Sequence, residues 1–231
     1  MKTNRIIVIL FAVSITLQAI NLFRGPSSAR PGKRQTAAEL VIDAPEGVVI
    51  DLAGLPVEGS STSAIVLVEF SDYECPFCSR HAQGAGKKIR EELVETGKIR
   101  HAFANNPLQM HKSARLLAAA AICSGQQAQY WKMYDQLFAF KPTTIGEIHD
   151  ITKSLELNVQ TFDECMTSEN TESIIQKDMA KARELRLTGT PGFAIGQLDD
   201  NGVVHVQKLI TGAAPLQIFK KVIDGVSGAK A

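Results

Sequence analysis

Two cysteines separated by two residues, Cys75 and Cys78, are the residues of this chain best suited by type and spacing to covalent chemistry. They follow an apolar, β-branched run at 64–68 that predicts a buried strand. Pro76 fits the first position of a helix, where its missing N–H is not needed. Cys75 would then cap that helix, where free N–H groups and the helix dipole favour the thiolate, the form that attacks disulfides. Cys78, one turn later, is placed to close a ring with Cys75.

The bulk composition limits the kind of protein. A chain of 231 residues that is 45% hydrophobic can build one sizeable core, with room for an inserted subdomain. The formal net charge of +1 gives no reason to expect a nucleic-acid partner.

The first 23 residues predict export. A basic start precedes an apolar stretch at 6–23, a pattern typical of a secretory signal. The stretch is also close to the ~20 residues of a membrane span. A removed signal and an uncleaved membrane anchor at 6–23 both stay open, with a buried N-terminal helix of a cytosolic protein as the alternative. Either of the first two places the rest of the chain in a periplasmic or other extracytoplasmic compartment.

The remaining chain divides into elements that must position the cysteines. Residues 24–46, with several Pro, Gly and Ser, predict a flexible tether. A βαβ unit, a helical block at 107–187 and a ββα end follow, which predicts a mixed four-stranded sheet with the block inserted as its own small domain. The predicted strands are 64–70, 99–104, 193–195 and 203–210, with a further edge strand at 48–50; the predicted helices are 75–95, 113–123, 130–140, 145–155, 159–166, 171–187 and 215–226.

The other two cysteines, Cys123 and Cys165, lie on separate predicted helices of the block. Cysteines of exported chains tend to pair, so we expect a disulfide between them that stabilises the block by about 2–4 kcal/mol. Two buried free thiols are the alternative. A zinc site at Cys75 and Cys78 would need two more ligands, and Cys123 and Cys165 lack the C-x-x-C spacing, so neither a metal nor another cofactor is expected.

Four stretches resemble the DsbA-like branch of the thioredoxin superfamily: Glu69–Cys78, Pro107–His111, Gln129–Trp131 and Gly189–Pro191. The resemblance runs from about residue 46 to 227. It implies an α/β, thioredoxin-like fold built from 47–106 and 188–228, with an all-helical subdomain inserted at 107–187.

The resemblance also implies roles for single residues. Cys75 is the expected nucleophile and Cys78 the resolving thiol. Pro191 is the expected cis-proline facing them, leaving the backbone of Thr190 free to pair with an extended substrate; an ordinary trans turn is the alternative. Glu69 is the expected buried acid, with a raised pKa that lets it shuttle protons for Cys78. The alternatives place Glu69 at the solvent or pair it with Arg100 or His101.

The dipeptide between the cysteines, Pro76-Phe77, departs from the strongest oxidants of the family, which place His there. Phe77 supplies no charge, and Glu74 opposes ionisation of Cys75. We therefore expect the helix end to be the main stabiliser of the thiolate. The pair should be less oxidising than those members, yet more oxidising than thioredoxin at about −270 mV. His81 is expected at the surface, and His111 in a structural hydrogen bond.

Together these residues predict an exported thiol–disulfide oxidoreductase that passes the Cys75–Cys78 disulfide to reduced, cysteine-containing exported proteins. The resemblance implies reoxidation by a quinone-linked membrane protein of the DsbB or VKOR kind. Two other readings of the same residues stay open. One is an exported reductase or isomerase; the other is a non-catalytic module that binds peptides along Thr190–Pro191, with the cysteine pair merely structural.

Overall fold

The computed structural model describes residues 37–228 of the chain. The predicted signal or anchor at 1–23 and the predicted tether up to residue 36 lie outside these residues. Within the described range, no helix combines the length and apolar character needed to cross a membrane.

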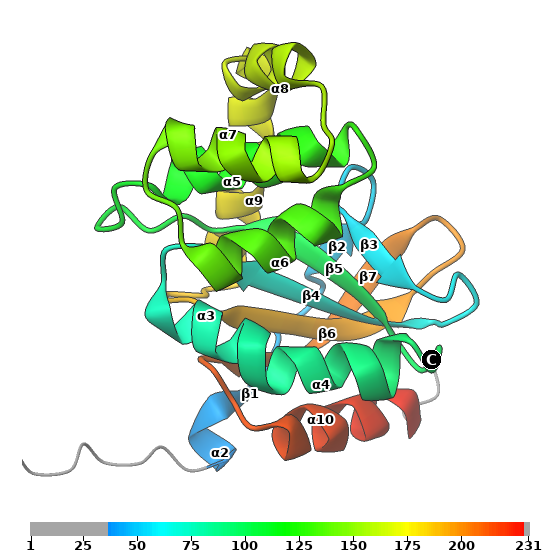
Figure 1. The fold of residues 1–231 in the computed structure, drawn as a ribbon. Helices are drawn as coiled ribbons and strands as arrows, with labels where there is room; N and C mark the ends of the chain where they lie inside the picture. The colour runs from blue at the N-terminus through cyan, green and yellow to red at the C-terminus, as the bar shows by residue number, and fades with distance from the viewer. Residues whose placement is uncertain (1–36, 229–231) are drawn as a thin grey trace, which may run out of the picture. The chain divides into compact units, whose positions relative to one another are not determined.

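The described residues form a seven-stranded mixed sheet (Figure 1). Its strand order is β1-β7-β6-β4-β5-β3, and β2 also pairs with β7. Strands β4 and β5 are parallel, and the other pairs are antiparallel. The strands are β1 (Val41–Asp43), β2 (Val49–Asp51), β3 (Val57–Gly59), β4 (Ile65–Ser71), β5 (Arg100–Asn105), β6 (Gly192–Leu198) and β7 (Val203–Thr211).

The sheet has seven strands, so the prediction of a four-stranded sheet was wrong. Two of its edge strands, β1 and β3, were not predicted. β1 and β3 contain three residues each, too few for a pattern of alternation to stand out. Val41 of β1 pairs with Ile210, and Val57 of β3 pairs with Ala102. The predicted tether is also wrong for residues 37–43, which form α2 (Ala37–Leu40) and β1 because this segment pairs with β7 and packs on the core.

Helices cover both faces of the sheet. One continuous helical stretch follows β4 and consists of α3 (Pro76–His81), the π-helical turn η1 (Ala82–Gly86), α4 (Lys87–Ile89) and a second π-helical turn, η2 (Arg90–Val94). It packs with α10 (Leu216–Gly228) on the face that carries Ile65 and Leu67. On the opposite face lie Val66 and Val68, since successive side chains of a strand point to opposite sides.

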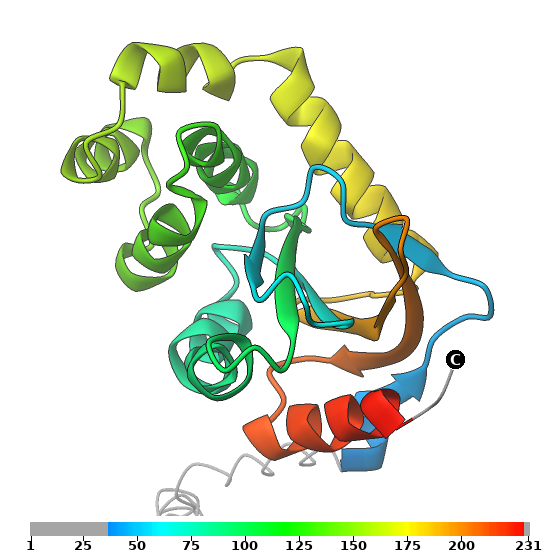
Figure 2. The same ribbon diagram turned by 90° about the vertical axis from the view of Figure 1, so that its right-hand side faces the viewer.

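The helical block contains α5 (Ala114–Gly125), α6 (Tyr130–Phe140), α7 (Ile145–Ser154), α8 (Val159–Met166) and α9 (Glu169–Glu184). Figure 2 shows α9, in yellow, on the other side of the sheet from α3 and α10. Ala182 at the end of α9, with Leu185 and Leu187 after it, packs against the β4 face that carries Val66. The last helix of the block therefore covers the sheet directly.

The core of the helical block reaches the cysteines. Tyr73, Cys75 and Cys78 belong to the same buried cluster as Leu137 and Phe138 of α6. The ring of Tyr73 lies 4.8 Å from that of Phe138, and its hydroxyl lies 3.1 Å from that of Tyr130. The turn before α3 is thus fixed by packing against the block.

Candidate active site

The cysteine pair lies where β4 gives way to α3. Cys75 occupies the N-cap position in an extended conformation, with φ of −69° and ψ of 124°, and Pro76 starts the helix. The Cys75 amide donates to the carbonyl of Asp72, 3.1 Å away, which closes the turn after the strand. Both cysteines are free thiols and buried, Cys78 completely.

The surroundings of Cys75 favour its thiolate. The thiol of Cys78 donates a hydrogen bond to the Cys75 sulfur, which is the largest effect on its pKa. Burial raises the pKa of Cys75, while the Thr190 side chain and the N–H groups of Cys78 and Phe77 lower it as further hydrogen-bond donors. The pKa of Cys75 falls to about 5. Helix-end amides contribute as expected, and the Cys78 thiol is the largest single contributor.

The pKa of the second cysteine, Cys78, is shifted in the opposite direction. Burial raises the pKa of Cys78 far above its ordinary value, and the adjacent Cys75 sulfur raises it further. The hydroxyl of Ser71 and the side chain of Thr190 work in the other direction without overcoming burial. At neutral pH the pair therefore holds one thiolate and one thiol, the arrangement that an attacking and a resolving cysteine require.

A loop from the far end of the chain faces the pair. The Thr190–Pro191 peptide bond is cis. As a thiol, Cys75 donates to the carbonyl oxygen of Thr190, at 3.6 Å. The Thr190 hydroxyl is buried and has no hydrogen-bond partner among the described residues, which leaves it free to donate to the Cys75 thiolate.

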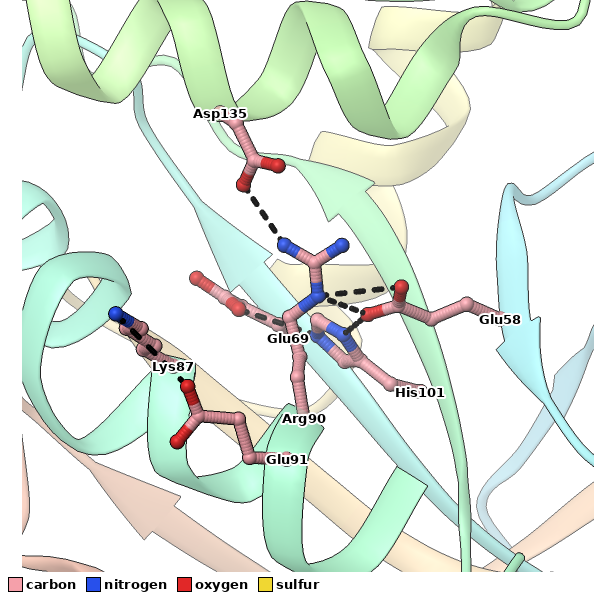
Figure 3. A network of polar contacts seen from close by, with 7 residues as sticks. All are labelled: Glu58, Glu69, Lys87, Arg90, Glu91, His101 and Asp135. Carbon is pink, nitrogen blue, oxygen red and sulfur yellow. Dashed lines mark hydrogen bonds and ion pairs between the residues drawn. The ribbon is translucent and has the colours of Figure 1, made fainter. Parts of the chain in front are cut away.

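The buried acid of β4 has a partner. Glu69 Oε2 lies 3.2 Å from Nε2 of His101 on β5 (Figure 3), as in one of the alternatives left open, whereas Arg100 donates to the carbonyls of Ser61 and Ser63. Burial raises the pKa of Glu69, but the hydrogen bond from His101 and the charge of that imidazolium outweigh it, and the pKa lies below its usual value. The expectation of a raised pKa was wrong.

His101 itself is held between two carboxylates. Its Nδ1 lies 2.9 Å from Oε1 of Glu58 on β3, and its Nε2 faces Glu69. Burial alone would lower the pKa of His101, but hydrogen bonds to Glu58 and Glu69 raise it to about 9. His101 is therefore an imidazolium at neutral pH.

The polar network continues from Glu58 to the helical block. Arg90 Nε lies 2.9 Å from Glu58 Oε1, and Arg90 Nη1 lies 2.7 Å from Asp135 of α6 (Figure 3). The guanidinium also lies over the rings of Trp131 and Tyr134. Glu58 was not predicted from the sequence, because no pattern in the sequence marks its short strand as part of the sheet.

Two carboxylates beside Cys75 hold the loop before α5. The Asp72 Oδ2 atom accepts from the Leu108 amide and lies 2.8 Å from His111 Nδ1. The Glu74 carboxylate accepts from the Ser113 amide at 2.6 Å. His111 thus makes a structural hydrogen bond. Burial lowers its pKa, but Asp72, and with it the charge of Cys75, raises the pKa above the ordinary value.

His81 lies in the core, so the expectation of a surface position was wrong. Its ring packs 4.6 Å from Phe193 and 5.4 Å from Phe219, between α3 and the sheet. Gly86, one turn on, leaves room for it, since a Cβ there would lie 3.1 Å from the ring. Burial lowers the pKa of His81, so the ring is neutral.

The remaining cysteines are joined. Cys123 of α5 and Cys165 of α8 form a disulfide, with a Cα–Cα distance of 5.6 Å. Both sulfurs lie beside the hydroxyl of Thr171 in the helical block. The bond closes 42 residues of chain, and the redox-capable pair at 75 and 78 is separate from it.

Two large apolar side chains are exposed on segments next to the cysteine pair. Phe77 is 53% exposed and Met110, beside His111, is 79% exposed. Two cavities, of about 440 and 680 Å³, are lined by neither cysteine. Among the described residues, no group of three or more His, Cys, Asp or Glu side chains is placed to hold a metal ion.

The fold and the site define a thioredoxin-fold protein with a C-x-x-C thiol pair at a helix N-terminus and a cis-proline opposite. Residues 53–208 match the sequence profile of the family described as Thioredoxin, and the chain belongs to that family. The predicted thioredoxin-like α/β fold is confirmed.

Two relatives show how far the similarity extends. Disulfide bond formation protein D of Bacillus subtilis is 27% identical over 150 residues, which cover 61% of this chain and 67% of that protein. The Na(+)/H(+) antiporter NhaA 3 of Salinispora tropica is 25% identical over 219 residues, covering 92% of this chain and 32% of the antiporter. The chain thus spans about a third of the antiporter's length.

Several solved structures have a similar fold. Oxidised BdbD of Bacillus subtilis has a TM-score of 0.65 at 24% identity and covers 77% of this chain and 95% of its own. The thiol–disulfide exchange protein α-DsbA2 of Wolbachia pipientis has a TM-score of 0.61 at 23% identity, covering 74% of this chain and 86% of its own. The resemblance to DsbA-like proteins is confirmed at the level of fold.

Proposed function

We propose that this protein is a thiol–disulfide oxidoreductase that introduces disulfides into exported proteins through Cys75 and Cys78. The observation that carries the proposal is the contrast between the two thiols. The pKa of Cys75 is lowered to about 5, and that of Cys78 is raised. A thiol with a low pKa is a good leaving group, which favours release of the oxidised substrate.

The exchange runs in two steps. A substrate thiolate attacks the Cys75 sulfur of the Cys75–Cys78 disulfide; a mixed disulfide forms, and Cys78 leaves and takes up a proton. A second substrate thiolate then attacks the substrate sulfur of the mixed disulfide, and Cys75 leaves as the stabilised thiolate. Two electrons pass from the substrate thiols to the protein. The backbone of Thr190 pairs with the extended substrate in this proposal, which is supported by the 3.6 Å between its carbonyl oxygen and the Cys75 sulfur.

The direction of electron flow follows from the pKa of Cys75. Thioredoxin combines a thiol pKa of about 7 with a potential of about −270 mV. Lowering the pKa to about 5 stabilises the reduced form at pH 7 by a further RT ln(101/2), about 2.3 kcal/mol, or about 50 mV. We therefore expect a potential near −220 mV, measured by equilibration with glutathione. A potential at or below that of thioredoxin would favour the reductase alternative.

The cellular location of the protein and its reoxidation are part of the same proposal. The apolar stretch at 6–23 exports the chain and tethers it to a membrane, or is removed, and the catalytic part acts in the periplasm or another extracytoplasmic space. The name of the Bacillus subtilis relative, disulfide bond formation protein D, supports the oxidising direction. A quinone-linked membrane protein of the DsbB or VKOR kind would restore the Cys75–Cys78 disulfide.

A substrate-oxidation assay tests the proposal. The oxidised protein is mixed with a reduced, unfolded protein that has several disulfides, and the loss of free thiols is followed. We expect stoichiometric transfer by the wild type, no turnover by Cys75→Ala, and trapped mixed disulfides with Cys78→Ala. Cys123→Ala/Cys165→Ala serves as the control that retains transfer. Unchanged substrate oxidation by Cys75→Ala would leave only the reading as a non-catalytic peptide-binding module.

A further inference from the structure

A cavity of about 440 Å³ lies between the sheet and the helical block, and neither active-site cysteine lines it. Its walls come from the loop between β2 and β3, the end of β5, the end of α5, the start of α6, and α9. Small-molecule sites in proteins have volumes of about 300–1,000 Å³. The cavity is therefore large enough for an organic molecule, and the exchange reaction makes no use of it.

The inner end of the cavity is polar and buried. Asp178 of α9 is 6% exposed, and Asn105 of β5 is 2% exposed. Asp178 Oδ2 accepts two hydrogen bonds from Asn105, one from the backbone N at 2.8 Å and one from Nδ2 at 3.0 Å. Gln126 and Ala128, by contrast, are exposed and form part of the rim. The cavity thus leads from the surface to a buried carboxylate.

Asp178 has a negative charge that no cation of the described residues balances. Burial raises its pKa to about 6 against the hydrogen bonds from Asn105, so the carboxyl is mostly ionised at neutral pH, and no nearby cation contributes to that pKa. Lys177 is exposed, and Lys181 donates to a backbone carbonyl of β2 and to Glu184. A buried carboxylate without a counter-ion is costly, so it indicates a cation that comes from outside the protein.

A purely structural role for Asp178 would not require this charge. The hydrogen bonds from Asn105 both end on Oδ2, and the carbonyl oxygen of an asparagine could accept them as well. The other carboxylate oxygen, Oδ1, is left without a hydrogen bond from the described residues. Asn105 Oδ1 is also buried and has no partner among them. The same hydrogen-bonded pair therefore offers two acceptors that lack a donor.

Apolar and aromatic side chains also line the cavity. The rings of Tyr130 and Trp131, with centroids 5.3 Å apart, both contribute to it. Leu55 and Val57 line it from the sheet side, and Ile174 lines it from α9. Such side chains provide contact area for a hydrocarbon group. The lining thus combines one negative charge with a largely apolar wall.

An organic cation fits this lining better than a metal ion does. Asp178 is the single carboxylate in the lining, and among residues 37–228 no group of three or more His, Cys, Asp or Glu side chains is placed to hold a metal. A hard cation such as Ca²⁺ takes about six to eight oxygen ligands. An ammonium group has three donors, enough for both free acceptors, and its hydrocarbon part suits the apolar wall.

We propose that this cavity binds a small organic ammonium ion whose hydrocarbon body is comparable in size to a phenyl group. The ammonium group binds the free oxygen of Asp178 and the amide oxygen of Asn105, and the body packs against Trp131. This site is separate from the cysteine pair, so the inference does not depend on the proposed function.

The single tryptophan of the chain reports on binding, because Trp131 lines the cavity. The full-length, oxidised protein is titrated with phenethylammonium chloride at neutral pH, and isothermal titration calorimetry measures the dissociation constant independently. We expect saturable binding with a Kd below about 1 mM. Phenethyl alcohol has nearly the same shape but no charge. It should bind at least about tenfold more weakly, since hydrogen bonds to charged groups are the stronger ones.

Two variants test the assigned contacts. Asp178→Asn keeps an oxygen for the Asn105 donors but removes the charge, and it should weaken phenethylammonium binding at least about tenfold. Val57→Lys places a tethered ammonium group at the rim, where the side chain is 38% exposed, and should weaken binding by competition and repulsion. Asp150→Asn removes a carboxylate from the separate cavity of about 680 Å³ and should leave binding unchanged. Far-ultraviolet circular dichroism checks that each variant is folded.

Four results would overturn the site. The first is no heat and no fluorescence change up to about 10 mM phenethylammonium. The second is equal affinity for phenethyl alcohol, which would indicate an apolar cavity without recognition of charge. The third is unchanged binding in folded Asp178→Asn or in Val57→Lys, which would place the ligand elsewhere. The fourth is a saturable response of Trp131 to calcium chloride that phenethylammonium does not displace, which would assign the cavity to a metal ion. Because these titrations do not measure disulfide exchange, the proposed function stands or falls separately.

Discussion

Replacement of Thr190 by valine isolates one of the contacts that lower the pKa of Cys75. Valine has nearly the shape of threonine but no hydroxyl. In the thiol form of the protein that hydroxyl is buried and has no hydrogen-bond partner among the described residues, so its loss should not destabilise the fold. In the thiolate form it is a donor to the Cys75 sulfur. The substitution therefore acts on the ionised state alone.

The size of the effect follows from that contact. A hydrogen bond to a charged group contributes about 1.5–3 kcal/mol, and about 1.4 kcal/mol corresponds to one pKa unit. Taking the lower value, the pKa of Cys75 should rise from about 5 to about 6. At pH 7 the reduced form then loses RT ln(101/11), about 1.3 kcal/mol, which makes the Thr190→Val protein about 30 mV less oxidising.

Two measurements check this prediction independently. The absorbance of the thiolate at 240 nm, titrated from pH 3 to 9, gives the pKa of Cys75. Equilibration with glutathione at pH 7 gives the potential. Thr188→Val, an exposed threonine in the same loop, is the matched control and should change neither quantity. If the pKa in Thr190→Val stays within about 0.3 of the wild-type value, the hydroxyl is not a donor to the thiolate, and the reasoning fails.

Three further predictions concern other contacts. Cys78→Ala removes the largest stabilising donor and should raise the pKa of Cys75 by more than Thr190→Val does, as followed at 240 nm. Cys123→Ala/Cys165→Ala opens a loop of 42 residues and should lower the free energy of unfolding in urea by about 4 kcal/mol, whereas a change near zero would exclude a structural role. The pKa of His101 in the folded state is about 9, above its ordinary 6.5. Its contribution to stability is thus complete below pH 6.5 and is lost as the pH rises through 9; urea titrations of the oxidised protein should show this decline, and His101→Gln should flatten it.

Local patterns predicted the elements that build the site. The β-branched run before Cys75 forms β4, and Pro76 begins α3 as its fixed φ favours. Helices α6 and α8 have the predicted bounds, because their apolar residues repeat with helical periodicity over their full length. These features depend on residues close together in the chain.

Contacts between distant segments were less accessible to prediction. The strands β1 and β3 are stabilised by pairing with β7 and β5. Each has only three residues, and so short a segment does not show from its own sequence which strand it pairs with. Glu58 was missed for this reason. The direction of the Glu69 pKa was also mispredicted, since it depends on a histidine 32 residues later in the chain. Burial of a carboxylate is visible from strand alternation, but the partner that reverses its effect is not.

Contacts from distant segments also explain how Cys75 reaches a low pKa without a histidine at position 77. The dipeptide between the cysteines contributes only the backbone N–H of Phe77, because Pro76 has none. The other donors come from Cys78 and from Thr190, more than a hundred residues away. Asp72 also orients His111 from the loop before α5, 2.8 Å from its Nδ1. A thiolate stabilised by several separate segments is sensitive to the packing that holds them together, so substitutions in the cis-proline loop or at Asp72 should change the potential even though neither lies between the cysteines.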